Sequence, residues 1–169
     1  MDADRIAAQL VGGDGARPSS DCEAFVMAWE KCFLVPYRDL GGRWTVGYGH
    51  LLGVDEPREP ITQEEAADLF YLDLQITAQG VARLIYLPLE QRQFDALCAF
   101  AFNVGLGNLA VSTLRKRVNG GYMDEAADQF LVWNKYKDSS GAYIESRGLR
   151  RRREAERALF ANGDYSGRP

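Results

Sequence analysis

The clearest pattern of apolar positions lies in the middle of the chain, where the spacing is that of one helix face. Its members recur at intervals of three and four residues and are Phe94, Leu97, Cys98, Ala101 and Phe102. Such spacing predicts a helix whose apolar face lies in the core. We expect Pro88 to start this helix and Asn103 with Gly105 to end it, because these residue types favour those positions.

Capping boxes predict two more helices. In each, a Ser or Thr is followed three residues later by a Glu, so that the two side chains can satisfy free backbone N–H groups. Ser20 with Glu23 opens a helix that carries apolar residues as far as position 33 and that Pro36 stops. The second box predicts a long helix over residues 62–85, in which Gly80 is expected to bend or end the helix.

The last third of the chain is predicted to be helical as well. We expect helices over residues 112–118, 124–136 and 150–161. Clusters of Asn, Gly, Ser and Asp at residues 119–121 and 138–141 are typical of the loops between them.

Residues 36–50 have a different pattern, which predicts a β-hairpin turning at Gly41–Gly42. Its register stays open at this point. A two-residue turn would pair Asp39 with Trp44, whereas a three-residue loop would pair Asp39 with Thr45 on the same face. A joint chemical role for Asp39 and Thr45 requires the second register.

One short hairpin beside five or six helices predicts an α+β protein that is mostly helical. A small hairpin lobe ahead of a larger helical lobe would leave a cleft between them, which is the usual place for a ligand. We interpret residues 1–18 as a flexible N-terminal arm, because they contain few large apolar groups. Residues 19–169 are expected to form a single domain.

Composition and charge narrow the function classes. The chain has 169 residues, of which 46% are apolar and 26% charged, and its net charge is −4. This balance argues against general binding to nucleic acid, and no segment has the roughly 20 apolar residues of a membrane helix. Several arginines nevertheless crowd the last quarter, namely Arg147, Arg150, Arg151, Arg152, Arg153 and Arg157.

Neither a metal nor a cofactor is expected. His50 is the only histidine, and Cys22, Cys32 and Cys98 lack the spacing of zinc ligands. The odd cysteine count favours reduced thiols over disulfides.

Three side chains suggest a chemistry. Glu30, at the end of the first helix, and Asp39 with Thr45, on either side of the glycine turn, resemble the acid and carboxylate that glycosidases use. The helix dipole and apolar neighbours would favour a protonated Glu30, whereas a buried arginine partner would favour the ionised form. Ordinary interpretations exist for each residue alone: a solvent-facing glutamate, a turn aspartate and a strand threonine.

The arrangement of these residues resembles the catalytic segment of the phage-type lysozymes, the muramidase endolysins of glycoside hydrolase family 24. Asp39 follows Glu30 by nine positions and Thr45 follows Asp39 by six. The likeness covers about residues 20–162 and continues through Thr45–His50, Gln93–Leu97, Phe102–Gly105, Ser112–Leu114, Phe130–Trp133, Gly148–Leu149, Arg152–Arg153 and Glu156.

The resemblance implies a lysozyme-like fold and hydrolysis of the β-1,4 bond from N-acetylmuramic acid to N-acetylglucosamine in peptidoglycan. It implies that Glu30 is the general acid, while Asp39 and Thr45 activate a water on the opposite face of the sugar. We expect inversion, for which carboxyl groups roughly 6.5–9.5 Å apart leave room for that water.

The resemblance also implies an arginine that pairs with the catalytic glutamate. We expect it to be Arg152, although the run Arg150–Arg153 leaves the choice open by one or two positions. His50 fits a hydrogen-bonded scaffold role better than that of a base. Asn103 can either cap its helix or reach an N-acetyl group in the cleft.

The first hypothesis is therefore an endolysin, monomeric and made in the host cytoplasm, which reaches the wall through a separate holin-type membrane pore. The first twenty residues lack the basic start and apolar run of a secretory signal. A catalytically silent glycan-binding or tail-structural module of the same fold is the alternative. A glycosidase for chitin-like polymers is a third, looser possibility.

Overall fold

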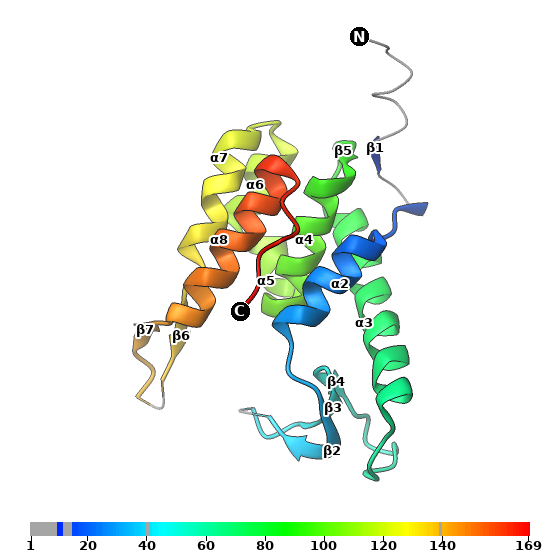
Figure 1. Ribbon diagram of the computed structural model, residues 1–169. Coiled ribbons are helices and arrows are strands. Elements are labelled where there is room, and N and C mark those ends of the chain that lie inside the picture. Colours follow the sequence, from blue (N-terminus) through cyan, green and yellow to red (C-terminus); the bar gives the residue numbers. More distant parts are fainter. Residues whose placement is uncertain (1–9, 12–14, 40, 139) are drawn as a thin grey trace.

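The structure, a computed structural model, describes residues 10–11, 15–39, 41–138 and 140–169 (Figure 1). Its helices are α2 (Ser20–Trp29), α3 (Gln63–Leu84), α4 (Gln91–Val104), α5 (Leu106–Val111), α6 (Thr113–Asn119), α7 (Met123–Gln129), the 3-10 helix η2 (Phe130–Val132) and α8 (Arg147–Asn162). Its strands are β1 (Leu10–Val11), β2 (Phe33–Arg38), β3 (Trp44–Gly47), β4 (His50–Leu51), β5 (Leu89–Glu90), β6 (Lys135–Lys137) and β7 (Tyr143–Glu145).

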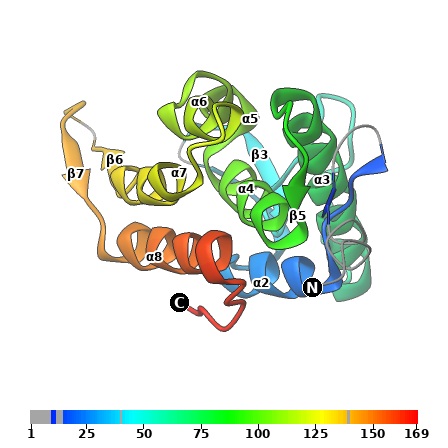
Figure 2. The ribbon, with the colours of Figure 1, turned by 90° about the horizontal axis from the view of Figure 1, so that it is seen from above.

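Helix α4 is the centre of the core. Figure 2 shows it surrounded by the other helices, with α2 and α8 on one side and α3, α5 and α6 on the other. Every side chain from Gln93 to Ala101 is buried, so this helix is covered on all sides and not only on its apolar face. The apolar spacing thus correctly predicted a helix in the core, and the helix is buried on its polar side as well.

The start of α4 differs from the prediction. Pro88 does not open the helix, because Leu89–Glu90 form a strand that pairs with β1. The helix begins after Glu90, which forms a capping box with Gln93. The end is as expected, since Gly105 follows the last helical residue with a φ of 89°.

Helix α3 connects the helical body to the sheet formed by β2, β3 and β4 (Figure 1). The predicted capping box of Thr62 and Glu65 is confirmed, with both reciprocal hydrogen bonds present. Gly80 does not end the helix. A methyl group there would lie 2.2 Å from Leu106 Cδ1, so the glycine makes room for the side chain of α5.

Helix α2 also has different bounds from those predicted. Its N-cap is Ser19, whose hydroxyl accepts a hydrogen bond from the Cys22 N–H, and not Ser20. Its last helical residue is Trp29, so Pro36 does not stop it. Pro36 lies instead inside β2, which already begins at Phe33.

The hairpin has neither of the two registers considered. Tyr37 pairs with Thr45, and the Asp39 N–H donates to the Arg43 carbonyl at 2.9 Å. The reason is the Asp39 side chain, because Oδ1 accepts from the N–H groups of Gly41 and Arg43 and closes a tight turn. The direct pairing of Asp39 with Thr45 that we expected for a joint role is therefore absent. Asp39 follows β2 two positions after Tyr37, the partner of Thr45, so the alternation of side chains still places Asp39 and Thr45 on one face.

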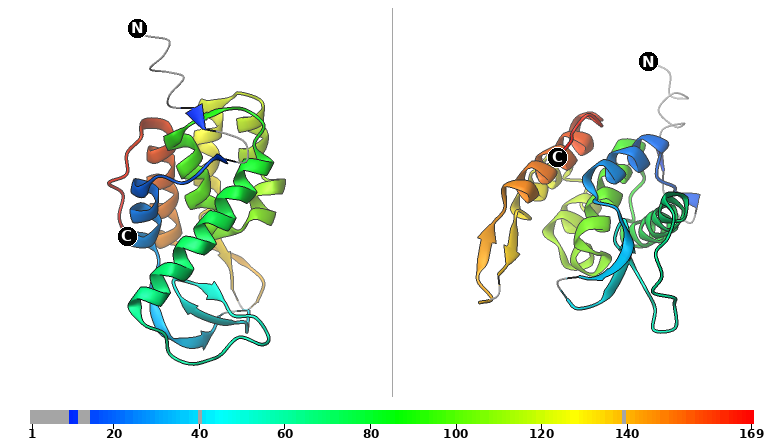
Figure 3. Two further views of the ribbon diagram at one scale, coloured as in Figure 1. Left: turned by 90° about the vertical axis from the view of Figure 1, so that its right-hand side faces the viewer. Right: turned by 60° about the horizontal axis from the view of Figure 1, so that its bottom comes forward.

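The C-terminal part contains a second hairpin that the sequence analysis missed. The helical segment ends at Val132, so the prediction of a helix to position 136 was wrong. Lys135–Lys137 pair with Tyr143–Glu145, and the Asp138 carboxylate accepts from the N–H groups of Ser140 and Ala142 to form the turn. Figures 1 and 3 show this hairpin and the β2–β4 sheet extending from the same end of the helical body.

The expected N-terminal arm, residues 1–18, lies partly outside the described residues, at positions 1–9 and 12–14. Of the described positions, Leu10–Val11 pair with β5, and Ala16 is buried in the core. At these positions the chain is attached to the body. Among the described residues, no helix has the length and apolar character to cross a membrane.

Candidate active site

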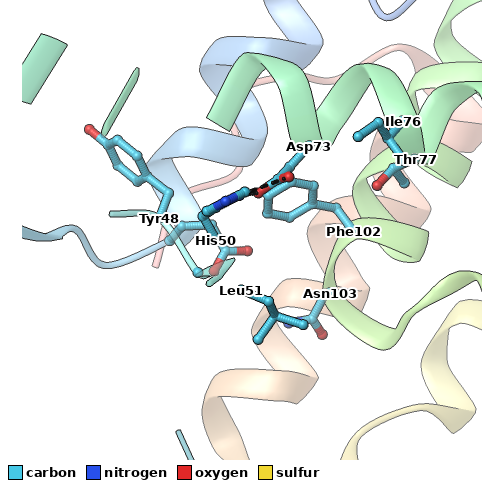
Figure 4. A pocket seen from close by; sticks show the side chains of 10 residues that line it. Tyr48, His50, Leu51, Asp73, Ile76, Thr77, Phe102 and Asn103 are labelled. Carbon is cyan, nitrogen blue, oxygen red and sulfur yellow. Dashed lines mark hydrogen bonds and ion pairs between the residues drawn. The ribbon is translucent and has the colours of Figure 1, made fainter. Parts of the chain in front are cut away.

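A cleft of about 350 Å³ lies where the small sheet meets helices α3 and α4 (Figure 4). Its lining residues are Glu30, Tyr48, Gly49, His50, Leu51, Asp73, Ile76, Thr77, Phe102 and Asn103. Three residues that the sequence analysis singled out, Glu30, His50 and Asn103, therefore come together in one cavity. Asp39, Thr45 and Arg152 do not line it directly.

Glu30 is placed by the end of helix α2. Its N–H donates to the Met27 carbonyl at 3.2 Å, and its backbone is already extended, so the side chain leaves the helix axis. Glu30 Oε1 lies 2.7 Å from Arg152 Nη1. The Glu30 side chain is 21% exposed and that of Arg152 only 6%, so the carboxyl is accessible while its partner is fixed inside the protein.

The pairing arginine is thus the expected one. Arg150 and Arg151 are exposed, whereas Arg152 and Arg153 are buried. The orientation of α8 determines which arginine can contact Glu30. Four consecutive arginines point in four directions around a helix, and only two of those directions face the core.

Arg152 belongs to a buried group of charges on α8. Its Nε lies 3.1 Å from Glu156 Oε1, and Glu156 Oε2 lies 2.8 Å from Arg153 Nη1. Arg153 Nη2 in turn donates to Asn103 Oδ1. Burial raises the pKa of Glu156 against the effect of the two arginines, and burial likewise lowers the pKa of Arg153.

Asp39 lies at the turn of the hairpin with several donors around it. Besides the two backbone N–H groups, Arg43 Nη2 lies 2.8 Å from Asp39 Oδ2. The hydrogen bond from the Arg43 backbone is the main cause that lowers the pKa of Asp39, with the Arg43 guanidinium adding to it. Asp39 is therefore a carboxylate at neutral pH.

Thr45 is 3% exposed, and its hydroxyl donates to the Arg43 carbonyl at 3.3 Å. Its cross-strand partner Tyr37 was not among the predicted site residues. Burial raises the pKa of the Tyr37 hydroxyl, and the negative charges of Asp39 and Glu30 add to this effect. Tyr37 thus lies within electrostatic reach of both carboxylates.

His50 connects the sheet to helix α3. Its Nδ1 lies 2.9 Å from Asp73 Oδ2, and Figure 4 shows the ring directed at that carboxylate. This contact fits the expected scaffold role. Asp73 was not predicted as a lining residue, although Asp73, Ile76 and Thr77 have the helical spacing of one face.

Two further hollows adjoin the cleft at Asn103. One of about 330 Å³ is lined by Trp29, Asn103, Ser146, Gly148, Leu149, Arg151, Arg152 and Pro169. The other, of about 760 Å³, is lined by Asn103, Val104, Asn108, Val132, Trp133, Lys135, Tyr136, Tyr143 and Leu149. Because all three share Asn103, the hollowed surface continues from the small sheet to the β6–β7 hairpin. Among the described residues, no three His, Cys, Asp or Glu side chains are grouped to hold a metal ion.

Comparison with known proteins decides the family. Residues 27–156, more than half of the chain, match the family model described as phage lysozyme. The chain belongs to the phage lysozyme family. The matched range begins just before Glu30 and ends at Glu156, so it contains the cleft residues and the buried charges of α8.

Individual members of the family are also similar to this chain. An endolysin of Bacillus phage B103 is 44% identical over 121 residues, which are 72% of this chain and 44% of that protein. An endolysin of Acyrthosiphon pisum secondary endosymbiont phage 1 is 38% identical over 135 residues, 80% of this chain and 91% of that protein. The chain thus spans less than half of the first relative and most of the second.

A solved structure supports the same assignment. The muramidase domain of SpmX from Asticaccaulis excentricus superimposes with a TM-score of 0.79 and 32% identity, covering 86% of this chain and 98% of that one. The expected fold class is confirmed: this phage lysozyme family member is α+β and mostly helical, with a small sheet beside a larger helical lobe.

Proposed function

We propose that this member of the phage lysozyme family is an endolysin that hydrolyses the β-1,4 bond between N-acetylmuramic acid and N-acetylglucosamine in bacterial peptidoglycan. The observation that carries the proposal is the Glu30 carboxyl, which is accessible from the cleft and held by Arg152 at 2.7 Å. The relatives named endolysin and the muramidase domain support the same substrate class.

Glu30 is the general acid in this mechanism. It transfers its proton to the glycosidic oxygen as the bond from that oxygen to the anomeric carbon breaks. The anomeric carbon then carries positive charge, and the leaving sugar departs with the proton as its hydroxyl. The Glu30 carboxylate that remains is stabilised by Arg152, because the guanidinium already lies beside it.

Asp39 and Thr45 act on the water in our proposal. A carboxylate that is ionised at neutral pH stabilises the charged anomeric carbon and accepts a proton from the attacking water. Thr45 orients the water from the face that it shares with Asp39. To do so, the Thr45 hydroxyl gives up its hydrogen bond to the Arg43 carbonyl. Attack from the face opposite the leaving group inverts the anomeric centre.

A turbidity assay tests the proposal. The protein is added to outer-membrane-permeabilised cells, and clearing is compared with that of Glu30→Gln. We expect the substitution to abolish clearing, while Glu59→Gln, an exposed glutamate outside the cleft, keeps it. Clearing that survives Glu30→Gln removes Glu30 as the acid, and no clearing by the native protein favours the catalytically silent glycan-binding module.

The stereochemistry has a separate test. Proton NMR during cleavage of a soluble glycan fragment identifies the anomer that is released first. Inversion supports a water placed between the sugar and Asp39. Retention would instead indicate a covalent intermediate, which needs carboxyl groups only about 5–5.5 Å apart.

We also propose that the protein acts as a monomer and reaches the wall from the host cytoplasm through a separate holin-type pore. The test is expression in a host with and without a co-expressed holin, with culture density as the readout. Lysis only in the presence of the holin is expected, and lysis without it would refute the route. Size-exclusion chromatography with light scattering measures the oligomeric state.

A further inference from the structure

A chain of charged and polar side chains runs through the interior and returns to the cleft. It connects Glu30 to Arg152, Arg152 to Glu156, Glu156 to Arg153, and Arg153 to Asn103. Its two ends, Glu30 and Asn103, both line the cleft. Its middle members, Glu156 and Arg153, have no exposed side-chain surface.

A contribution to stability does not by itself explain why these charged side chains are buried. Taking two charges out of water is costly, and apolar residues of similar volume often give a protein of equal stability. Arg153 Nε is buried without a hydrogen-bond partner among the described residues, which adds to the cost. The guanidinium also lies 5.0 Å from the centre of the Phe100 ring, inside the aromatic core.

Glu156 fixes the orientation of Arg152. It binds Nε, while the Ala99 carbonyl lies 3.5 Å from Nη2. A guanidinium is planar, so two anchored nitrogens determine where the third points. Nη1 of Arg152 is thereby directed at Glu30 Oε1. The other carboxyl oxygen, Glu30 Oε2, has no hydrogen bond to the described residues and is left for a substrate.

Arg153 fixes the orientation of the Asn103 amide in a similar way. A guanidinium only donates hydrogen bonds, so it requires the amide oxygen and not the NH₂ group. The Asn103 NH₂ group is therefore turned toward the hollowed surface that the residue lines. There it can donate to a carbonyl oxygen, such as that of an N-acetyl group.

We propose that Glu156 and Arg153 are positioning residues: from the buried face of α8 they hold the Glu30 proton donor and the Asn103 amide donor in place relative to each other. The proposal rests on the proposed function, because it assigns these residues a role in cleavage of an N-acetylated glycan. Glu156 acts through Arg152 on Glu30, and Arg153 acts through Asn103 on the sugar.

The first experiment replaces both charges together. In Glu156→Met with Arg153→Met one negative and one positive charge leave the interior together, and Arg152 keeps Glu30 as a partner, so we expect the variant to stay folded and to melt cooperatively. The rate of clearing should nevertheless fall roughly 10- to 100-fold, since small displacements of catalytic groups have effects of that size. Glu154→Gln is the control, an exposed glutamate on the same helix. A stable double variant with full activity would overturn the proposal.

The second experiment is a pair of double-mutant cycles on a soluble N-acetylated glycan fragment. If Arg153 acts through Asn103, Arg153→Met should raise KM in the native background and have no further effect in Asn103→Ala. Glu156→Gln should lower kcat in the native background and have little effect in Arg152→Ala. Additive effects in both cycles would mean that the residues only support the fold.

A measurement independent of activity separates this proposal from the proposed function. The side-chain NH₂ signals of Asn103 are recorded by NMR in the native protein and in Arg153→Met. One well-resolved pair that broadens or shifts in the variant indicates that Arg153 orients the amide, whether or not the native protein clears cells. Unchanged signals would refute the role of Arg153, and absent clearing with changed signals would refute only the proposed function.

Discussion

Arg152 Nη1 lies 2.7 Å from Glu30 Oε1, although 122 positions separate the two residues in the chain. The contact joins the end of α2 to the buried face of α8, two helices that lie on the same side of α4 although they are far apart in the sequence (Figure 2). Because Arg152 also binds Glu156, it is shared between two carboxylates.

The first prediction concerns this arginine. Arg152→Ala leaves Glu156 with one partner and Glu30 with none, so we expect a loss of about 3–5 kcal/mol in the free energy of unfolding and loss of most lytic activity. Arg150→Ala, at an exposed position, should change stability by less than about 0.5 kcal/mol. Chemical denaturation and cell clearing measure both. Equal losses would mean that the Glu30 contact does not matter for the reaction.

The importance of a planar guanidinium can be tested at the same position. Arg152→Lys keeps the charge but not the fork that binds Glu30 and Glu156 at once. We expect stability between those of the native protein and Arg152→Ala, with clearing well below native. Native activity would show that charge alone is sufficient there.

The second prediction separates the two interpretations of Thr45. If its hydroxyl orients the water, Thr45→Val should lower kcat on a soluble glycan fragment roughly 100-fold, whereas Thr45→Ser keeps most of it. Both variants should melt close to the native temperature, because only one hydrogen bond to a backbone carbonyl is involved. An active Thr45→Val protein would leave Thr45 as a strand residue only.

The third prediction concerns the contact between the sheet and α3. His50→Gln and Asp73→Asn each weaken the hydrogen bond at 2.9 Å, and we expect a cost of about 1–2 kcal/mol in stability. Clearing should decrease by a few-fold at most if His50 is a scaffold residue of the cleft wall, as its contact with Asp73 favours, and not a base in the reaction. Abolished clearing in a protein of native stability would instead make His50 part of the chemistry.

The elements that could be predicted from the sequence are those decided by neighbouring residues. Helix α3 follows from the local capping box of Thr62 and Glu65, and α4 from its own apolar spacing. The hairpin register could not be predicted, because the Asp39 side chain competes with strand pairing for the same backbone N–H groups. A pattern of strand residues does not show whether strand pairing or the side-chain hydrogen bonds of Asp39 determine the register.

Other features depend on contacts between distant segments. Gly80 resembles a helix terminator by itself, and only the side chain of Leu106 shows why a glycine lies inside the helix. Likewise, nothing near Asn103 in the sequence indicates that Arg153 binds its amide. The Arg152 contact was predicted only through the family resemblance, since four consecutive arginines are locally equivalent.

The fourth prediction concerns Asp39. NMR titration should give a pKa below the ordinary 3.8, because the carboxylate accepts hydrogen bonds that a protonated group would lose. Arg43→Ala should raise this pKa only in part, since the Arg43 backbone N–H is the largest cause and remains in the variant. A full return to the ordinary value would show that the guanidinium dominates. A low pKa keeps Asp39 ionised at neutral pH, which its proposed action on the water requires.

The last prediction concerns the C-terminal segment, which is fixed by a buried carboxylate. Tyr165 donates to Asp95 Oδ2 at 2.7 Å, and burial together with this hydrogen bond raises the pKa of the Tyr165 hydroxyl above its ordinary value of 10.0. The folded state therefore keeps this proton at pH values where the unfolded chain loses it. The stabilisation is fully present below pH 10.0, and it decreases as the pH rises toward the higher folded pKa.

Tyr165→Phe removes the hydroxyl and with it this pH dependence. We expect a loss of about 1 kcal/mol at neutral pH and a difference from native that shrinks above pH 10.0, as measured by urea unfolding at several pH values. Tyr86→Phe, at an exposed tyrosine, is the matched control and should behave as native. A constant difference between Tyr165→Phe and native across this range would mean that Asp95 does not hold the tyrosine proton in the folded state.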